Sequence, residues 1–396
     1  MKSSKPLADV NITRILRLLW QKKRISRGKI ASILQLDKST VTKITSVLTD
    51  MNLICEAYEG DPGPQGGRRP VYIELVKTFA CVGGIEINPE RLSCSLLDLQ
   101  GNVVFDYRKD LTPDDFAAKS CIGIFFEAYK LLRSAAKQIS VPLAGIGVGL
   151  PAYINNNKGI IIQSIPLLIN EPLDFISRIE TDVSIPVYLE NDARCCCYSE
   201  LVLKSDSWQE NMLYVLVEYR PIQPVENAPK NLSVGLGLVF NGEVLHGADC
   251  SAGEFRSILW REGNRTQFFN GERELVTMDD ETVVRPIFEE LAQNVAFLVN
   301  TLNIDRLYIG GLPTQYAGQL VTIIRNRIDY QWPYTNVRSI QISTANLAES
   351  AVSFGAAGLV LEKLFQLPGL KSAGEQKDDR FRGKSILELF NSLQKS

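Results

Sequence analysis

The first fifty or so residues carry apolar side chains at helical spacing. Apolar positions recur at steps of three and four over residues 9–24, which predicts one amphipathic helix. A second series over residues 27–54 predicts two helices joined by a tight turn. Asp37 directly precedes the later helix and is expected to cap its first free N–H groups. The predicted buried stripe of that helix consists of Val41, Ile44, Val47, Leu48 and Met51.

The opposite face of the later helix is basic and rich in hydroxyl groups near its N-terminus. Its residues are Lys38, Ser39, Thr40, Thr42 and Lys43. A recognition helix in DNA has this layout, because its N-terminal residues meet base edges and phosphates. An ordinary amphipathic helix with a basic, solvated face fits the same residues equally well. The helix alone therefore leaves both interpretations open.

The segment after this helix favours DNA binding. Two short apolar strands are predicted on either side of the Gly- and Pro-rich residues 59–69, and together they form a hairpin. A hairpin behind two such helices is typical of a winged helix-turn-helix. Arg68 and Arg69 end the turn, where guanidinium groups reach phosphates or a narrow minor groove, although a solvated loop would also carry them. Residues 1–76 are therefore predicted to be a winged helix-turn-helix DNA-binding domain.

From residue 77 the pattern changes to alternating strands and helices. Three apolar strands joined by tight turns precede a long helix, and a second strand-rich half follows. This order predicts an α/β fold. It resembles the duplicated, two-lobed fold of actin and sugar kinases, in which ligands bind in the cleft between the lobes. The expected strands are 80–87, 92–99, 103–105, 144–150, 187–189, 212–218, 232–240 and 306–309, and the expected helices are 114–139, 283–302 and 351–365.

This order divides the rest of the chain into three parts. A first α/β lobe is expected over residues 77–190 and a second over residues 191–370. The tail, residues 371–396, begins polar and ends with apolar residues on one helical face. It is expected to form a helix that packs on the body, and a partner-binding helix is the alternative.

Charge is distributed unevenly between these parts. The whole chain has a formal charge of −2, but residues 1–76 contain 13 basic and 7 acidic residues. The module therefore carries +6 and the remainder −8, which fits a polyanionic partner for the module alone. No apolar run reaches membrane-spanning length, and the N-terminus lacks the apolar core of a signal peptide. A cytoplasmic protein with no membrane partner is expected.

Cysteine and histidine usage argues against disulfides and metal sites. The eight cysteines include no C-x-x-C pair, and three of them are adjacent at Cys195–Cys197, a spacing that does not clamp a tetrahedral metal. Reduced, mostly buried thiols are expected. His246 is the only histidine, which excludes a His-rich metal site.

Several motifs, taken in their order along the chain, resemble those of the ROK family of sugar-responsive repressors and sugar kinases. Each motif is weak alone, but their order behind a winged module covers nearly the whole chain. The resemblance implies a two-lobed body of the actin and sugar-kinase (RNase H-like) class, a sugar or sugar-phosphate ligand, and a homodimer or homotetramer. The motifs are GGRRP at 66–70, GIEINPERLSCSLLDLQGNVV at 84–104, GVGLP at 147–151, ENDAR at 190–194, GLGLVFNGEVLHGADCSAGEF at 235–255, IGG at 309–311 and FGAAG at 354–358.

The chain departs from this family at the phosphate loop. Kinases of the family read D-x-G-G-T-K there, whereas this chain has Glu86, Asn88, Pro89, Glu90 and Arg91 in the same register. Pro89 lacks the N–H that a phosphate would accept, and Glu90 places a like charge beside it. ATP binding is expected to be weakened or lost. A plain hairpin turn with no ligand role is the favoured description.

The resemblance also implies sugar contacts at Asn191, Asp192 and Glu254. Asp192 aligns with the general base of the kinases, and a carboxylate there can also accept hydrogen bonds from sugar hydroxyls without catalysis. Adjacent Asn and Asp at a strand end are common turn residues as well. Sugar contact is favoured over a purely structural turn.

Two further departures concern the family's zinc site and the helix turn. Ser257 occupies the position of a zinc-binding histidine, and residues 261–274 contain no cysteine, so no metal is expected. Arg256 and Ser257 could supply different sugar contacts, and a structural role is expected for His246. Gln35 occupies a turn position where the family commonly has Gly or Asn. A left-handed backbone there would cost about 1 kcal/mol, so Gln35 is expected to carry that strain or the turn to differ slightly.

These residues together predict a sequence-specific DNA-binding transcriptional regulator, a repressor controlled by a sugar or sugar phosphate. Its expected partner is a double-stranded DNA operator, and no cofactor or catalytic residue is expected. The alternative is an ATP-dependent sugar kinase with an appended helical module, in which Asp192 would be the base.

Overall fold

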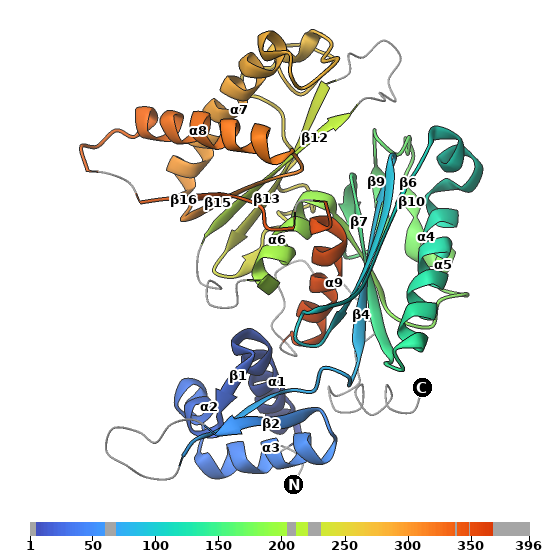
Figure 1. Ribbon diagram of the computed structural model, residues 1–396, viewed down its shortest axis with the longest axis vertical. Helices are drawn as coiled ribbons and strands as arrows, with labels where there is room; N and C mark the ends of the chain where they lie inside the picture. The colour runs from blue at the N-terminus through green and yellow to red at the C-terminus, as the bar shows by residue number, and fades with distance from the viewer. Residues whose placement is uncertain are drawn as a thin grey trace.

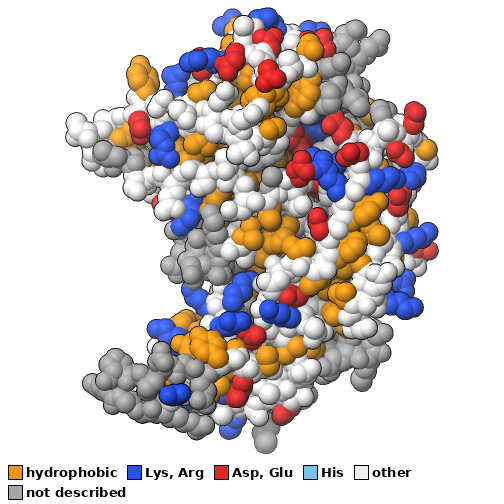
Figure 2. Space-filling view, viewed as in Figure 1, with side chains coloured by type: hydrophobic (Ala, Val, Ile, Leu, Met, Phe, Trp, Pro, Cys, Tyr) orange, Lys and Arg blue, Asp and Glu red, His pale blue; other side chains and the backbone are white. Residues whose placement is uncertain are grey.

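The computed structural model of the protein describes residues 5–59, 69–203, 211–220, 231–336, 339–347 and 349–366. Figure 1 shows a small N-terminal module beside two larger α/β parts, each built on its own sheet. Figure 2 shows acidic and basic side chains interspersed over the same face of the molecule. Two helices lie between these sheets. The arrangement confirms the predicted class, a winged helix-turn-helix module followed by a two-lobed α/β body.

The N-terminal module combines helices with a small sheet. Its elements are α1 (Lys5–Lys22), β1 (Arg24–Ser26), α2 (Arg27–Leu34), α3 (Lys38–Asp50), β2 (Ile54–Glu59) and β3 (Val71–Leu75). The strand order is β1-β3-β2, and β3 is antiparallel to both neighbours. The helices and the β2–β3 wing confirm the prediction from periodicity. The short strand β1 was not predicted, because three residues are too few to show an alternating pattern.

Two details of α3 differ from the prediction, and one agrees. Val47 was assigned to the buried stripe but is 46% exposed, because at about 100° per residue it lies about 120° from the line through Val41 and Leu48. Asp37 stands at the N-cap, but its side chain makes no capping bond. Gln35 has φ 53° and ψ 45°, so it carries the left-handed turn conformation that was expected.

The first sheet of the body has the strand order β11-β7-β4-β5-β6. Its strands are β4 (Cys81–Asn88), β5 (Arg91–Asp98), β6 (Val103–Asp110), β7 (Leu143–Leu150) and β11 (Val187–Asn191). The first three form an antiparallel meander, and β7 and β11 run parallel to β4. Helix α4 (Pro113–Gln138) covers one face of this sheet. Because β4 is buried along its whole length, it reads as a continuous apolar run in the sequence.

A smaller antiparallel sheet and a short helix lie between β7 and β11 in the chain. These elements are β8 (Tyr153–Asn155), β9 (Ile160–Gln163), β10 (Leu173–Asp174) and α5 (Phe175–Ile179). They were not predicted. Their apolar side chains join the core under α4, so this insertion belongs to the first lobe.

The second sheet has the strand order β14-β13-β12-β15-β16. Its strands are β12 (Met212–Arg220), β13 (Asn231–Phe240), β14 (Glu243–Val244), β15 (Arg306–Gly310) and β16 (Gln341–Thr344). Two helices, α7 (Glu281–Leu302) and α8 (Thr314–Gln331), cover its outer face (Figure 1) and share one apolar core with it. Helix α7 confirms the prediction for residues 283–302, whereas α8 was not predicted.

Helices α6 (Asp192–Leu203) and α9 (Ala351–Leu364) fill the space between the two sheets (Figure 1). Helix α9 packs on β4, β5 and β7, and α6 packs on α9, β12 and β13. A Cβ atom added to Gly84 of β4 would lie 1.8 Å from the carbonyl oxygen of Ser353. A Cβ atom added to Gly355 of α9 would lie 1.8 Å from that of Cys195 in α6. The three backbones therefore touch directly, which only glycine permits.

The N-terminal module and the first lobe share one apolar core. Trp20 of α1 stacks on Phe365 at the end of α9, with ring centroids 5.5 Å apart, and both rings are buried. Beside them, Arg17 Nη2 lies 2.8 Å from Glu362 Oε1. The Lys23 ammonium donates to the carbonyl oxygen of Gln100 in the turn between β5 and β6. Burial lowers the pKa of Lys23 to about 8.

None of the described helices is both long enough and apolar enough to cross a membrane. The predicted tail helix, residues 371–396, lies outside the described residues.

The close contact between β4 and α9 predicts that Gly84→Ala lowers stability. The added methyl group meets a backbone carbonyl that cannot rotate away, so a loss of about 2 kcal/mol or more is expected. The melting temperature checks this. Gly318→Ala is the control, because an added Cβ on this exposed glycine of α8 meets nothing within 4 Å and improves helix propensity. Equal melting temperatures for Gly84→Ala and the unsubstituted protein would contradict the packing.

Candidate nucleic-acid interface and interlobe site

Helix α3 lies on the side of the N-terminal module that faces away from the two sheets (Figure 1). Lys38, Ser39, Thr42 and Lys43 are exposed, and Thr40 is half-buried. The hydroxyl of Thr42 donates to the carbonyl oxygen of Lys38 at 2.8 Å. The predicted polar face is thus open to a partner and is not covered by the described part of the body. That these residues contact DNA stays a prediction.

The same face extends further along α3 than was predicted. Ser46 is exposed and follows Thr42 by four residues, so it lies one turn along the same face. Its spacing from Thr42 was the signal that could have revealed it. On the wing, Tyr58 is exposed and stacks on Tyr72 with ring centroids 4.8 Å apart, so two aromatic rings stiffen the hairpin. The described part of the wing includes Arg69, which is exposed, whereas Arg68 lies outside the described residues.

Asn191 and Asp192 lie where β11 ends and α6 begins. Asn191 Oδ1 accepts hydrogen bonds from the N–H groups of Ala193 and Arg194 at 3.0 and 3.2 Å, which makes Asn191 the cap of α6. Its Nδ2 donates to the carbonyl oxygen of Ala152 at 3.3 Å. The turn role considered for Asn191 is therefore present, and its sugar contact remains a prediction.

The Asp192 carboxylate is 8% exposed and lies among other charged groups. Burial and the nearby Glu218 carboxylate raise the pKa of Asp192 to about 7, although Arg220 acts in the opposite direction. Glu254 also acts on Asp192 electrostatically. It lies on the strand-like segment paired with Gly235, and a Cβ on Gly235 would lie 3.8 Å from Asp192 Oδ1. The structure thus brings two of the predicted sugar-binding carboxylates together between the lobes.

The segment that the resemblance aligns with the kinase phosphate loop is a hairpin turn between β4 and β5, as favoured from the sequence. Its side chains are tied to the other lobe. Arg91 donates to Glu86 Oε1 at 2.5 and 2.8 Å and to Glu218 Oε1 of β12 at 2.9 Å. Asn88 Nδ2 lies 3.4 Å from both Glu218 oxygens. These contacts form an ionic bridge between the two sheets next to Asp192.

Glu218 and Arg220 complete this bridge, and sequence reasoning missed both. Arg220 Nη2 donates to Glu218 Oε2 at 2.7 Å, and both side chains are buried. Burial alone would raise the pKa of Glu218, but Arg220 and Arg91 outweigh it and hold that pKa below its usual range. Two charged residues at alternate positions of an apolar strand were the available signal, since they face the same side.

In the family that this chain resembles, the segment that starts at the position of Ser257 binds zinc. In this protein the segment is stabilised by other contacts. Ser257 is buried, and its hydroxyl accepts from Asn294 Nδ2 at 3.2 Å. The Arg256 guanidinium stacks over Trp260, 4.2 Å from the ring centroid, and Arg265 pairs with Glu272 at 3.1 Å. Within the described residues, no group of three or more His, Cys, Asp and Glu side chains is arranged to hold a metal. All eight cysteines are free, and all but Cys55 are buried, as expected.

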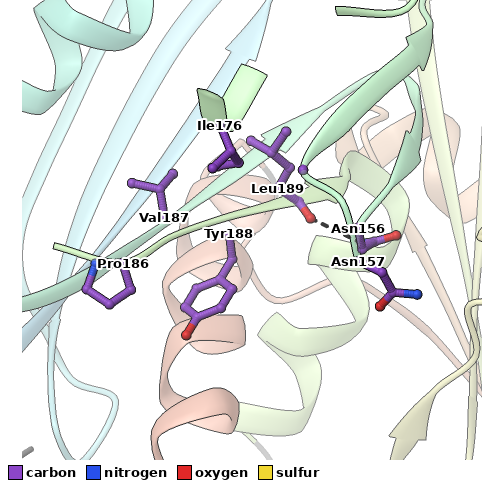
Figure 3. A pocket seen from close by; sticks show the side chains of 8 residues that line it. Asn156, Asn157, Ile176, Pro186, Val187, Tyr188 and Leu189 are labelled. Atoms are coloured by element: carbon purple, nitrogen blue, oxygen red, sulfur yellow. Dashed lines mark hydrogen bonds between the residues drawn. The ribbon is translucent and has the colours of Figure 1, made fainter. Parts of the chain in front are cut away.

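A small cavity is lined by residues of β11 and of the chain between β8 and β11, and Figure 3 shows its lining. Asn156 Nδ2 donates to the carbonyl oxygen of Leu189 there, at 3.1 Å. The predicted sugar-binding residues are not among those that line it. It is lined by Asn156, Asn157, Gly159, Ile176, Pro186, Val187, Tyr188 and Leu189.

Known proteins resemble this chain along most of its length. Residues 82–262 match the ROK family. The chain is 23% identical over 408 residues to the putative xylose repressor of Caldicellulosiruptor sp. (strain Rt8B.4). This alignment covers 91% of this chain and 98% of the relative.

Two solved structures share the fold. One is a ROK family transcriptional regulator described as a homologue of the E. coli MLC protein, with a TM-score of 0.68, 21% identity, and coverage of 90% of this chain and 97% of that one. The other is the ROK hexokinase from Thermus thermophilus, with a TM-score of 0.51, 18% identity, and coverage of 70% of this chain and 96% of the hexokinase.

The raised pKa of Asp192 predicts a pH-dependent effect of Asp192→Asn on stability. The unfolded chain loses this proton near pH 4, whereas the folded chain keeps it to about pH 7. Stability contributed by the protonated carboxyl is therefore lost as the pH rises from about 4 to about 7. The Asn variant is expected to melt at least about 2 °C higher than the unsubstituted protein at pH 8 and at a similar temperature at pH 4.5.

Thermal unfolding of both proteins across this pH range checks the prediction. Asp329→Asn, which changes an exposed aspartate of α8, is the control and is expected to lack this pH-dependent gain. A melting temperature of Asp192→Asn that falls below that of the unsubstituted protein at pH 8 would contradict it.

Proposed function

We propose that this chain is a DNA-binding transcriptional repressor of the ROK family, controlled by a sugar. The observation that carries the proposal is the open polar face of α3 on a winged module that shares its core with a sugar-kinase-like body. The relative named as a putative xylose repressor spans nearly the same length, and the regulator of known structure has the same fold. A cytoplasmic location, where operator DNA is accessible, accords with this role.

The proposed DNA contacts are Lys38, Ser39, Thr40, Thr42 and Lys43 on α3 and Arg68 and Arg69 on the wing. The N-terminal residues of a recognition helix reach base edges, and the basic groups reach phosphates. A homodimer would place two copies of α3 about 34 Å apart, in successive major grooves of a palindromic operator.

The proposed effector is an aldose such as xylose, bound between the lobes by Asp192 and Glu254, with Asn191 beside them. Carboxylates accept hydrogen bonds from sugar hydroxyls. The name of the relative supplies xylose as the first candidate. A sugar phosphate is disfavoured by the carboxylate of Asp192 and by those of Glu218 and Glu254, both of which act on Asp192 electrostatically.

Kinase activity is proposed to be lost. Pro89 and Glu90 occupy the turn where the kinases hold ATP phosphates, and the Arg91 guanidinium is already bonded to Glu86 and Glu218. A phosphate would have to compete with two buried carboxylates for that arginine, which is unfavourable.

A path from the effector site to the DNA-binding module runs along the packed helices. Helix α6 begins at Asp192, and Val202 near its other end belongs to the core shared with α1. Helix α9 is pressed against α6 and ends at Phe365, which stacks on Trp20. Sugar binding would favour a different arrangement of the lobes and so a different spacing of the two α3 helices.

Lys43→Ala is expected to weaken binding to operator DNA about tenfold and to reduce the slope of log affinity against log salt by about one, because one phosphate contact is lost. Electrophoretic shift with DNA from upstream of the protein's own coding sequence, at several salt concentrations, measures both. Lys137→Ala, which removes the same charge from the exposed end of α4, is the control. Salt-insensitive binding with no sequence preference by the unsubstituted protein would overturn the proposal.

D-xylose is expected to raise the melting temperature and to release the operator, and Glu254→Gln is expected to weaken both effects. Glu262→Gln is the matched control on an exposed loop residue.

A panel of aldoses and their phosphates, tested with a coupled assay for ADP release, addresses the kinase alternative. If the protein phosphorylates any of these sugars and Asp192→Asn abolishes that turnover, the sugar-kinase alternative would be favoured instead.

A further inference from the structure

Glu190, the residue before the proposed sugar-binding pair, is a fully buried carboxylate with a side-chain partner on each oxygen. Its Oε1 accepts from Arg194 Nε at 2.7 Å and from the N–H of Asn191 at 2.8 Å. Its Oε2 lies 2.8 Å from His246 Nε2. The single histidine of the chain therefore meets Glu190 near the end of β11, two residues before α6 begins.

His246 and Arg194 tie a distant loop to this point. Arg194 Nη1 donates to the carbonyl oxygen of Ala252 at 2.8 Å, and the N–H of Ala252 donates to the carbonyl oxygen of His246 at 3.0 Å. Two residues after Ala252 the loop reaches Glu254, whose backbone pairs with Gly235. The loop that delivers Glu254 is thus fastened at His246 to Glu190 of β11 and at Ala252 to Arg194 of α6.

The charges at this point reinforce the attachment. Burial alone would raise the pKa of Glu190, but Arg194 and then His246 outweigh it and hold that pKa well below its usual range. Glu190 therefore stays ionised, and a buried carboxylate that loses one partner is costly. Arg194 also attracts Glu254 electrostatically, so the same guanidinium acts on Ala252 and on Glu254 near the end of the loop.

We propose that Glu190, Arg194 and His246, the Glu190 clamp, are positioning residues that hold the loop at 246–254 so that Glu254 stands opposite Asp192. This inference rests on the proposed sugar-binding function. The clamp does not touch the sugar. It sets the separation of the two carboxylates that accept the hydroxyl groups, and a loop free to move would bind the same sugar more weakly because ordering it costs entropy.

His246 is the member best suited to a test, because its side chain is 34% exposed and its loss does not open the core. In the full-length protein, His246→Ala is expected to weaken binding of D-xylose about tenfold, since a hydrogen bond to a buried charge is lost. His246→Gln retains an amide donor and is expected to restore the affinity to within about threefold. Operator affinity in the absence of sugar is expected to be unchanged in both variants.

Isothermal titration with D-xylose and D-glucose measures the sugar affinities. Hydrogen–deuterium exchange without sugar follows peptides that cover residues 246–254, which are expected to exchange faster in His246→Ala and at the original rate in His246→Gln. Ser251→Ala is the control in the same loop, because its hydroxyl bonds only to Asp249.

Each outcome decides a different point. Unchanged sugar affinity in His246→Ala overturns the clamp, and so does unchanged exchange of the loop. A loss in His246→Ala that the Gln variant does not recover also overturns it, because a purely steric role would then suffice. If the unsubstituted protein binds neither sugar, the proposed function fails, and the exchange rates alone decide whether the clamp holds the loop.

Discussion

In the centre of the body, α9 lies against β4 on one side and α6 on the other, with only glycine hydrogens between the backbones at Gly84 and Gly355. Most of the remaining arrangement depends on this contact. It joins the two sheets through one pair of helices and leaves little freedom for either helix to move alone. Because α6 starts at the proposed effector site and α9 ends against Trp20, the same contact links that site to the DNA-binding module.

The region between the lobes is stabilised by pairs of buried charges and not by apolar contacts alone. Arg91 and Arg220 neutralise Glu86 and Glu218, and Arg194 neutralises Glu190. Buried ion pairs contribute little net stability compared with apolar packing, but each fixes a geometry once formed. Arg220 offsets only in part the effects of burial and of Glu218 on Asp192, and the pKa of Asp192 is raised as a result. A buried carboxylate that lowers the stability of the fold in this way is typical of a functional site.

The sequence predicted correctly those elements that bury one face and expose the other. Helix α1, helix α3 and the wing each have one apolar side and one solvated side, so their periodicity is visible. The same method failed for α6, whose described residues are nearly all buried, because a helix surrounded by protein has no polar face to mark its period. It also placed Val47 in the core of α3, since a valine at the edge of a stripe looks like a member of it.

The sequence by itself determined the winged module, the α/β class of the body, the departure at Pro89 and Glu90, and the residues proposed to meet DNA and sugar. The winged module, the α/β class and the residues proposed to meet DNA depend on local spacing and on side-chain chemistry, which the chain displays in order. The departure at Pro89 and Glu90 and the sugar-binding residues follow from the resemblance to the ROK family. Only the tertiary structure decided that α9 packs on the first sheet, that Glu218 meets Arg91, and that His246 reaches Glu190. The residues joined by these contacts lie far apart in the sequence, and their partners are selected by how the sheets and helices pack, which no short stretch of sequence records.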